Sequence, residues 1–210
     1  MLLRLPQRRA FLCLPQTKTL LHLLRGTYVL LPNRGNLLKY DLDYYENMLR
    51  EYSKTAEEIS SVRWDWIKET NPKVVLDYGS GVSWFRAWRP KGVEVYSYDI
   101  AKYPQTGIKL ITYDVICFWD VLEHIRDFDE IEPVLRLSRN VALSLPLVKE
   151  ENLAAWKHFK PGEHLHYFTE KTLNALFEKY GFMQVRIGQP ECPPRKDITS
   201  VLYKECRWKS

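Results

Sequence analysis

The stretch that most constrains the fold runs from Val74 to Asp99, with the sequence VVLDYGSGVSWFRAWRPKGVEVYSYD. It opens with a short apolar run over residues 74–76, which is typical of a buried parallel strand. Two glycines follow, and then a Trp-Phe-Ala-Trp pattern that suits a helix packed on a sheet. A second strand over residues 93–98 leads to Asp99. This order of strand, glycine turn, helix, strand and acid predicts a doubly wound α/β fold with a pocket for an adenosine-containing cofactor.

The residues expected to hold that cofactor are Asp77, Gly79, Gly81 and Asp99. Glycine reaches positive φ without a Cβ clash, and it lets the backbone come close to a ligand. The helix expected from about residue 82 directs unpaired N–H groups at the same ligand. Asp99 follows the turn at about the usual spacing of 20 residues, and its carboxylate can accept hydrogen bonds from two adjacent ribose hydroxyls.

The glycine pattern distinguishes two adenosine cofactors. A nicotinamide fingerprint would place glycine at position 84, where this chain has Trp84. The form Asp-x-Gly-x-Gly, with the acid two residues before the first glycine, resembles motif I of the class I S-adenosylmethionine-dependent methyltransferases. In that family a third glycine is common at the position of Ser83. The resemblance implies a Rossmann-like α/β fold, S-adenosyl-L-methionine as the cofactor, and methyl transfer as the reaction.

A second motif follows the next predicted strand. The string DVLEHI, which begins at Asp120, resembles a segment of many small-molecule class I methyltransferases, including the ubiquinone-pathway O-methyltransferases. The resemblance implies that Trp119 and Asp120 border the sulfonium end of the cofactor, where an aromatic face stabilises a cation by about 0.5–2 kcal/mol. His124 is the candidate general base, because the ordinary pKa of histidine lies near neutrality. The alternative is that Glu123 and His124 hold the loop through hydrogen bonds.

A third segment, PGEHLHYFTEKTLNALFEKYGF, resembles a stretch of the type 11, 12 and 23 methyltransferase group. Thr169 is expected to cap its helix, and Gly181 is expected to end it. His164 and His166 precede this helix, and we expect them to contact the substrate or to have structural roles. A metal set of Glu163, His164 and His166 would need three side chains on one face, which spacing alone does not indicate. No metal site is therefore predicted.

The sheet is expected to be mostly parallel and seven-stranded, with an antiparallel C-terminal hairpin as in the class I methyltransferases. Residues 198–203 are the predicted seventh strand, inserted into the sheet. Only fourteen residues separate Asp99 from the next clear strand at 114–119. A helix and a third strand normally need about twice that length. Residues 108–112 are therefore either a minimal third strand or an extension of the fourth.

The chain is expected to consist of an extension, residues 1–39, and a methyltransferase domain, residues 40–210. Seven of the 31 Lys and Arg residues lie in the first 40 residues, which contain no Asp or Glu. We interpret this leucine-rich arm as a structural extension, with organelle targeting as the alternative. Residues 40–70 are predicted to form one or two lid helices over the cofactor site. Tyr44 in this segment is a candidate substrate contact, although such aromatic residues also occur as simple core packing.

Composition limits the other functions. No run approaches the roughly 20 apolar residues of a membrane-spanning helix, and the four cysteines form no Cys-x-x-Cys pair that would indicate zinc or disulfides. A cytoplasmic protein is expected. Beyond residue 40, 24 basic residues stand against 26 acidic ones, which favours a small-molecule acceptor over nucleic acid. Two alternatives stay open: a nicotinamide-dependent oxidoreductase, and a catalytically inactive methyltransferase-fold binding or assembly module.

Overall fold

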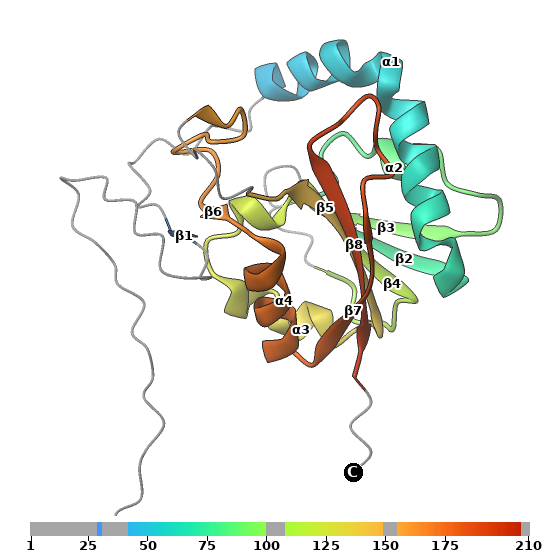
Figure 1. Cartoon of the computed structure of the whole chain (residues 1–210). Coiled ribbons are helices and arrows are strands. Elements are labelled where there is room, and N and C mark those ends of the chain that lie inside the picture. Colours follow the sequence, from blue (N-terminus) through green and yellow to red (C-terminus); the bar gives the residue numbers. More distant parts are fainter. Residues whose placement is uncertain (1–28, 31–41, 100–107, 149–154, 207–210) are drawn as a thin grey trace, which may run out of the picture.

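The computed structural model describes residues 29–30, 42–99, 108–148 and 155–206 (Figure 1). Their main element is one sheet of six strands in the spatial order β3-β2-β4-β5-β8-β7. The six strands are β2 (Val74–Tyr78), β3 (Glu94–Tyr98), β4 (Val115–Trp119), β5 (Asn140–Pro146), β7 (Phe182–Gly188) and β8 (Ile198–Glu205). Apart from this sheet, β1 (Val29–Leu30) pairs antiparallel with β6 (His166–Tyr167).

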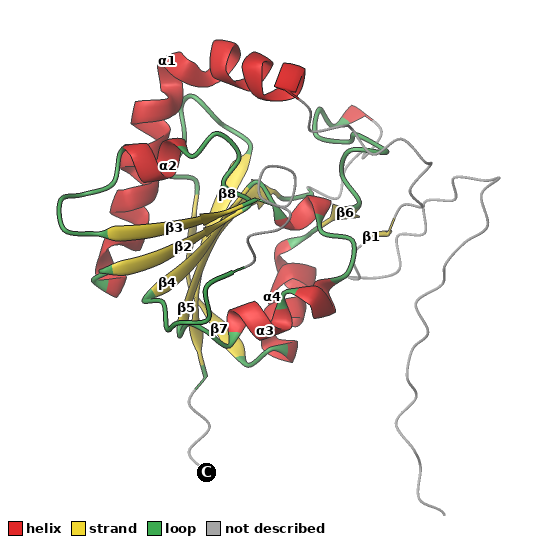
Figure 2. Ribbon diagram, turned by 180° about the vertical axis from the view of Figure 1, so that it is seen from behind, coloured by secondary structure: helices red, strands yellow, loops and turns green. Residues whose placement is uncertain are grey.

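Helices cover both faces of the sheet (Figure 2). One face carries α1 (Leu42–Ile67) and α2 (Trp84–Ala87), and the other carries α3 (Glu132–Leu135) and α4 (Glu170–Lys179). Three short 3₁₀ turns complete the described helical segments: η1 (Lys68–Thr70), η2 (Leu122–His124) and η3 (Phe128–Glu130). This layered arrangement confirms the predicted α/β fold.

Strand direction also confirms the mixed sheet. The strands β2, β3, β4 and β5 run parallel, whereas β8 is antiparallel to both of its neighbours, β5 and β7. The predicted inserted strand is therefore β8. The described residues hold six of the seven expected strands, because residues 108–112 form no strand and Tyr113 makes only an isolated bridge to Ser138. Within the described sheet, β3 is consequently an edge strand.

The sheet divides the core into two layers, and the side chains of β4 point alternately into one layer and the other. All five of its residues are buried, as expected for a central parallel strand. Ile116 and Phe118 pack toward α3 and α4, whereas Cys117 and Trp119 pack toward α1 and α2. This alternation follows from the two-residue period of a strand.

The predicted lid segment is one helix, α1, followed directly by η1. Its C-terminal half packs on the sheet, and the indole ring of Trp64 stacks on Phe85 of α2 with ring centroids 4.2 Å apart. The indole N–H of Trp64 also donates to the carbonyl of Phe85, at 3.0 Å. The side chain of Tyr44 lies outside the described residues, as does the extension 1–39 apart from β1. No helix in the described part of the chain is both long and apolar enough to cross a membrane.

Candidate functional site

The glycine turn after β2 is bonded to the end of β3. The N–H groups of Gly79 and Ser80 donate to the carbonyl of Tyr98, at 2.7 and 3.0 Å. The N–H of Gly81 donates to a carboxylate oxygen of Asp99, at 2.8 Å. Both glycines have positive φ, 75° at Gly79 and 49° at Gly81. The structure therefore brings the predicted turn and the predicted acid together at the carboxyl edge of two parallel strands.

The two glycines serve different physical needs. A Cβ on Gly79 would lie 2.5 Å from Cγ2 of Val121, so this position is required for packing against the segment after β4. A Cβ on Gly81 would meet nothing within 4 Å. Gly81 thus leaves open space above the backbone, as a turn that receives a ligand should. Ser83, at the position of the third glycine, also has positive φ, 62°, so the backbone keeps a left-handed conformation there without glycine.

Asp77 lies beneath this turn and is only 2% exposed. Its Oδ2 atom has no hydrogen-bond partner among the described residues. Burial raises the pKa of Asp77 to about 7, and the charge of Asp99 adds to this effect while that of Arg63 opposes it. A buried carboxyl oxygen without a partner, beside the open turn, suits a ligand that carries a hydrogen-bond donor or positive charge.

Asp120 is held by two arginines at the end of β4. Arg195 donates to both of its carboxylate oxygens, at 2.8 and 2.6 Å, and Arg63 donates to Oδ2 at 2.9 Å. Partial burial raises the pKa of Asp120, but the charges of Arg195 and Arg63 outweigh this effect and hold the pKa well below its ordinary value. The carboxylate is therefore ionised and already engaged with side chains of this chain.

Glu191 completes a cluster of four charges. Its side chain is fully buried, and it accepts hydrogen bonds from Arg63 Nε at 2.8 Å and from Arg195 at 2.6 Å. Sequence reasoning did not identify Arg63, Arg195 or Glu191 as site residues. The only local signal was the four-residue spacing of Glu191 and Arg195, which is typical of a helical ion pair.

Trp119 contacts a cation within the protein. The guanidinium carbon of Arg63 lies 4.9 Å from the ring centroid, and the ring of Phe85 meets that of Trp119 at 5.4 Å in an edge-on geometry. Trp119 is 6% exposed, and its indole N–H has no partner among the described residues. The aromatic ring predicted to face a sulfonium thus has a guanidinium over it.

The predicted histidines lie together because two distant segments run side by side. The N–H of Leu165 donates to the carbonyl of Glu123 at 2.7 Å. Nδ1 of His124 lies 2.9 Å from the carbonyl of Glu163, and the rings of His124 and His164 meet with centroids 4.9 Å apart.

His166 points elsewhere, with Nε2 2.6 Å from the carbonyl of Ile125. Burial lowers the pKa of His124 and lowers that of His164 to about 3. Both rings are therefore neutral at physiological pH. Burial also raises the pKa of the neighbouring Glu123 to about 8.

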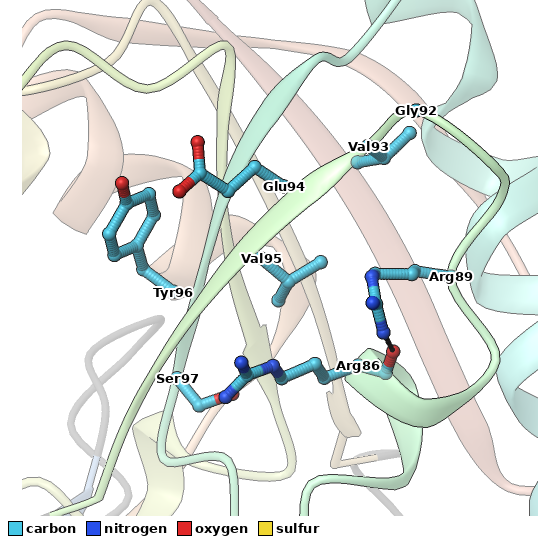
Figure 3. A pocket seen from close by; sticks show the side chains of 8 residues that line it. All are labelled: Arg86, Arg89, Gly92, Val93, Glu94, Val95, Tyr96 and Ser97. Atoms are coloured by element: carbon cyan, nitrogen blue, oxygen red, sulfur yellow. Dashed lines mark hydrogen bonds between the residues drawn. The ribbon is translucent and has the colours of Figure 1, made fainter.

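A separate cavity of about 470 Å³ lies along the edge strand β3 (Figure 3). Arg86 and Arg89, from α2 and the turn that follows it, line it together with residues 92–97. A guanidinium N–H of Arg89 donates to the carbonyl of Arg86 at 3.0 Å. None of the predicted site residues lines this cavity, so it is distinct from the glycine turn.

Comparison with known proteins identifies the family of the chain. Residues 44–186, more than half of the chain, match the model of a methyltransferase domain family of type 23. No protein of curated function matches the sequence significantly.

Solved structures share the fold at low identity. Magnesium protoporphyrin IX methyltransferase from Synechocystis, with bound S-adenosylhomocysteine, is 17% identical with a TM-score of 0.56 over 79% of this chain and 96% of that chain. The 1,6-didemethyltoxoflavin N1-methyltransferase of Burkholderia thailandensis, with its substrate and S-adenosylhomocysteine bound, is 15% identical with a TM-score of 0.57 over 81% and 88%.

A Nostoc punctiforme protein assigned as an O-methyltransferase is 14% identical with a TM-score of 0.55, over 77% of this chain but only 59% of that chain. At such identities these structures show the fold alone. Together with the family match, they lead to one conclusion: the chain belongs to the methyltransferase domain family and has the Rossmann-like fold of the class I S-adenosylmethionine-dependent methyltransferases.

Proposed function

We propose that this chain binds S-adenosyl-L-methionine and transfers its methyl group to a small-molecule acceptor. The observation that carries the proposal is the bond from Gly81 N–H to Asp99, with open space above Gly81, at the carboxyl edge of β2 and β3. In open α/β sheets ligands bind outside the carboxyl ends of the strands. A buried oxygen of Asp77, which has no partner in the described part of the chain, lies at the same edge and supports a ligand with donors or positive charge.

The residues proposed to bind the cofactor are Asp77, Gly79, Gly81, Asp99, Trp119 and Asp120. Gly79 and Gly81 shape the turn, and Asp99 accepts hydrogen bonds from the ribose hydroxyls. Trp119 and Asp120 border the methionine end, where Arg63 and Arg195 hold the carboxylate of Asp120 in place. The bound cofactor supplies a methyl carbon activated by the sulfonium, so the protein's main task is to align the acceptor with it.

For the acceptor side we propose Tyr44, His164 and His166 as substrate contacts and His124 as general base. Burial keeps His124 neutral at physiological pH, and a neutral imidazole can accept a proton. A small-molecule acceptor is supported by the near-neutral charge beyond residue 40. It is also supported by relatives that act on magnesium protoporphyrin IX and on 1,6-didemethyltoxoflavin.

A second candidate function is a catalytically inactive module that keeps the methyltransferase fold. The four-charge cluster favours it, since Asp120 is engaged by Arg63 and Arg195 rather than open to a ligand. A nicotinamide-dependent oxidoreductase has no comparable support. We further propose that residues 40–210 form the methyltransferase domain, that residues 1–39 are an extension, and that the protein is cytoplasmic. The free thiols of Cys117, Cys192 and Cys206 are compatible with that location.

Calorimetric titration with S-adenosylmethionine and S-adenosylhomocysteine tests the cofactor proposal. Asp99→Ala should weaken binding at least about tenfold, because the ribose loses its acceptor. Asp99→Asn keeps one acceptor oxygen for Gly81 N–H and separates loss of charge from loss of fold. The control is Asp65→Ala, an exposed carboxylate on α1 that should bind like the wild type.

Unchanged affinity in folded Asp99→Ala would contradict the ribose assignment. Binding of NADH instead would favour the oxidoreductase, and binding of neither cofactor would favour the inactive module. With binding established, release of S-adenosylhomocysteine in the presence of a metabolite library identifies the acceptor.

A further inference from the structure

Three potential metal ligands converge beside the proposed site. Glu123, His124 and His164 each place one donor atom within 4.8 Å of the other two. Donors that share a cation at 2.0–2.2 Å lie no more than about 4.4 Å apart. Small rotations of these side chains therefore suffice to bring all three onto one ion. This set differs from the Glu163, His164 and His166 set considered from spacing, because His166 is directed at the carbonyl of Ile125.

Two of the three side chains carry buried polar atoms that no described residue satisfies. Glu123 is 3% exposed and His164 is 5% exposed. Oε2 of Glu123 and Nδ1 of His164 have no hydrogen-bond partner among the described residues. Buried polar groups of native proteins are nearly always paired, so two buried atoms of this kind in one cluster are suited to share a bound species. A cation shared by the two atoms would satisfy both at once.

The third ligand is oriented by the backbone. Nδ1 of His124 lies 2.9 Å from the carbonyl of Glu163. Because a carbonyl only accepts, Nδ1 carries the proton, and the lone pair of the ring is on Nε2. A histidine that binds a metal with one nitrogen commonly donates the other N–H to a carbonyl or carboxylate in this way.

The two segments that supply the ligands are fixed to each other. The N–H of Leu165 donates to the carbonyl of Glu123 at 2.7 Å, between the positions of the ligands. Together with the bonds of His124 and His166, this contact holds η2 against the residues before β6. The ligands therefore come from a preorganised unit rather than from two independent loops.

We propose that Glu123, His124 and His164 bind one divalent first-row transition-metal ion such as Zn²⁺ or Mn²⁺. Two imidazoles and one carboxylate favour this class over Mg²⁺ and Ca²⁺, which prefer oxygen ligands throughout. Three protein ligands leave at least one position for water or for an oxygen of another molecule. The site goes beyond the proposed methyl transfer, and its occupancy is measurable without cofactor or acceptor. With an ion bound, His124 and His164 are its ligands and no longer serve as general base and substrate contact.

The test uses the full chain, stripped with a chelator and then titrated with Co²⁺, Mn²⁺, Zn²⁺ and Mg²⁺. The expected result is one Co²⁺ per chain with the visible absorption of a nitrogen-ligated ion, and a rise in melting temperature with Mn²⁺ or Zn²⁺. Glu123→Gln and His164→Ala should each weaken binding at least tenfold. The matched control is His166→Gln, which keeps an N–H donor for the carbonyl of Ile125 and should bind like the wild type.

The proposal is overturned if no ion binds stoichiometrically, if Mg²⁺ binds more tightly than the transition metals, or if folded Glu123→Gln and His164→Ala bind as the wild type does. Circular dichroism establishes that each variant is folded. Where a variant does not fold, the site is tested instead by NMR of the histidine imidazole resonances of the wild type. Selective broadening of His124 and His164 by Mn²⁺ supports the site, and its absence overturns it.

Discussion

Asp77 is the residue whose burial has the clearest chemical consequence. It ends the buried part of β2, is 2% exposed, and faces the layer under α1 and α2, where aromatic and aliphatic side chains dominate. Burial raises its pKa to about 7 despite the opposing charge of Arg63. The folded protein therefore holds a proton on Asp77 that the unfolded chain releases near pH 4.

We expect Asp77→Asn to change how stability depends on pH. Because the folded pKa is raised, the favourable contribution of protonated Asp77 is fully present below about pH 4 and is lost as the pH rises through 7. Between pH 5 and pH 8.5 the wild type should lose about 3 kcal/mol of unfolding free energy relative to Asp77→Asn, because about two of the three pK units of the shift lie in this window. Urea denaturation at the two pH values measures this difference. A difference that is constant with pH, or one matched by the exposed control Asp65→Asn, would contradict the assignment.

Other residues of the site show what local sequence can and cannot predict. The contact between the glycine turn and the acid was predictable because a turn and the strand that follows it form one short local pattern. That pattern contains Asp77, Gly79, Gly81 and Asp99. Arg63 was not, since its partners Asp120 and Glu191 lie 57 and 128 residues away. Contacts between residues so far apart in the sequence depend on how whole elements pack, and the spacing of residues along the chain does not predict them.

At the scale of elements, the two glycines of the turn should differ in what a substitution changes: Gly79 the stability of the fold, and Gly81 the affinity for the cofactor. Gly79→Ala should destabilise the fold by about 2–4 kcal/mol, since a Cβ there combines positive φ with a 2.5 Å contact to Val121. Gly81→Ala should cost only about 1 kcal/mol, because its Cβ would enter open space. That space is the proposed cofactor site, however, so affinity for S-adenosylmethionine should fall at least about tenfold.

Denaturation and calorimetry on the same two variants measure both quantities. Equal destabilisation by the two substitutions, or wild-type affinity in Gly81→Ala, would show that the open space is not used by the cofactor.

Elements with strong end signals were predicted well. Thr169 caps α4 through a reciprocal capping box with Thr172, and Gly181 follows the helix with φ 84°. These signals are local, so the sequence displays them directly. The segment between Asp99 and β4 is too short for a helix and a strand. The expectation that residues 108–112 form a minimal third strand or extend the fourth was wrong, because they form no strand and β4 begins only at Val115.

At the scale of the whole molecule, the four-charge cluster of Arg63, Asp120, Glu191 and Arg195 joins three regions. It links α1, the end of β4, and the connection between β7 and β8. Arg63 and Arg195 are 13% and 23% exposed, so solvent screens these pairs only partly. The cluster therefore positions α1 relative to the sheet.

Glu191→Gln should destabilise the protein by about 3 kcal/mol, because two partly buried guanidinium groups lose a charged partner. Chemical denaturation measures the loss, which added salt should change little. Glu205→Gln is the matched control, since Glu205 is 48% exposed and lies 3.8 Å from Arg139. Its effect should stay within about 0.5 kcal/mol. Similar values for the two variants would mean that the cluster does not hold α1 in place.

The place of β8 in the sheet has a consequence for how the chain is made. β8 is the last described strand along the chain, yet it lies between β5 and β7. During translation the parallel half, with the glycine turn and Asp99, can assemble on the ribosome as soon as β5 emerges. The outer edge of β5 then stays unpaired until residues 198–205 are synthesised, and unpaired edges invite contact with other chains. The synthesis of residues 198–205 is thus the step that closes the described sheet and covers the edge of β5.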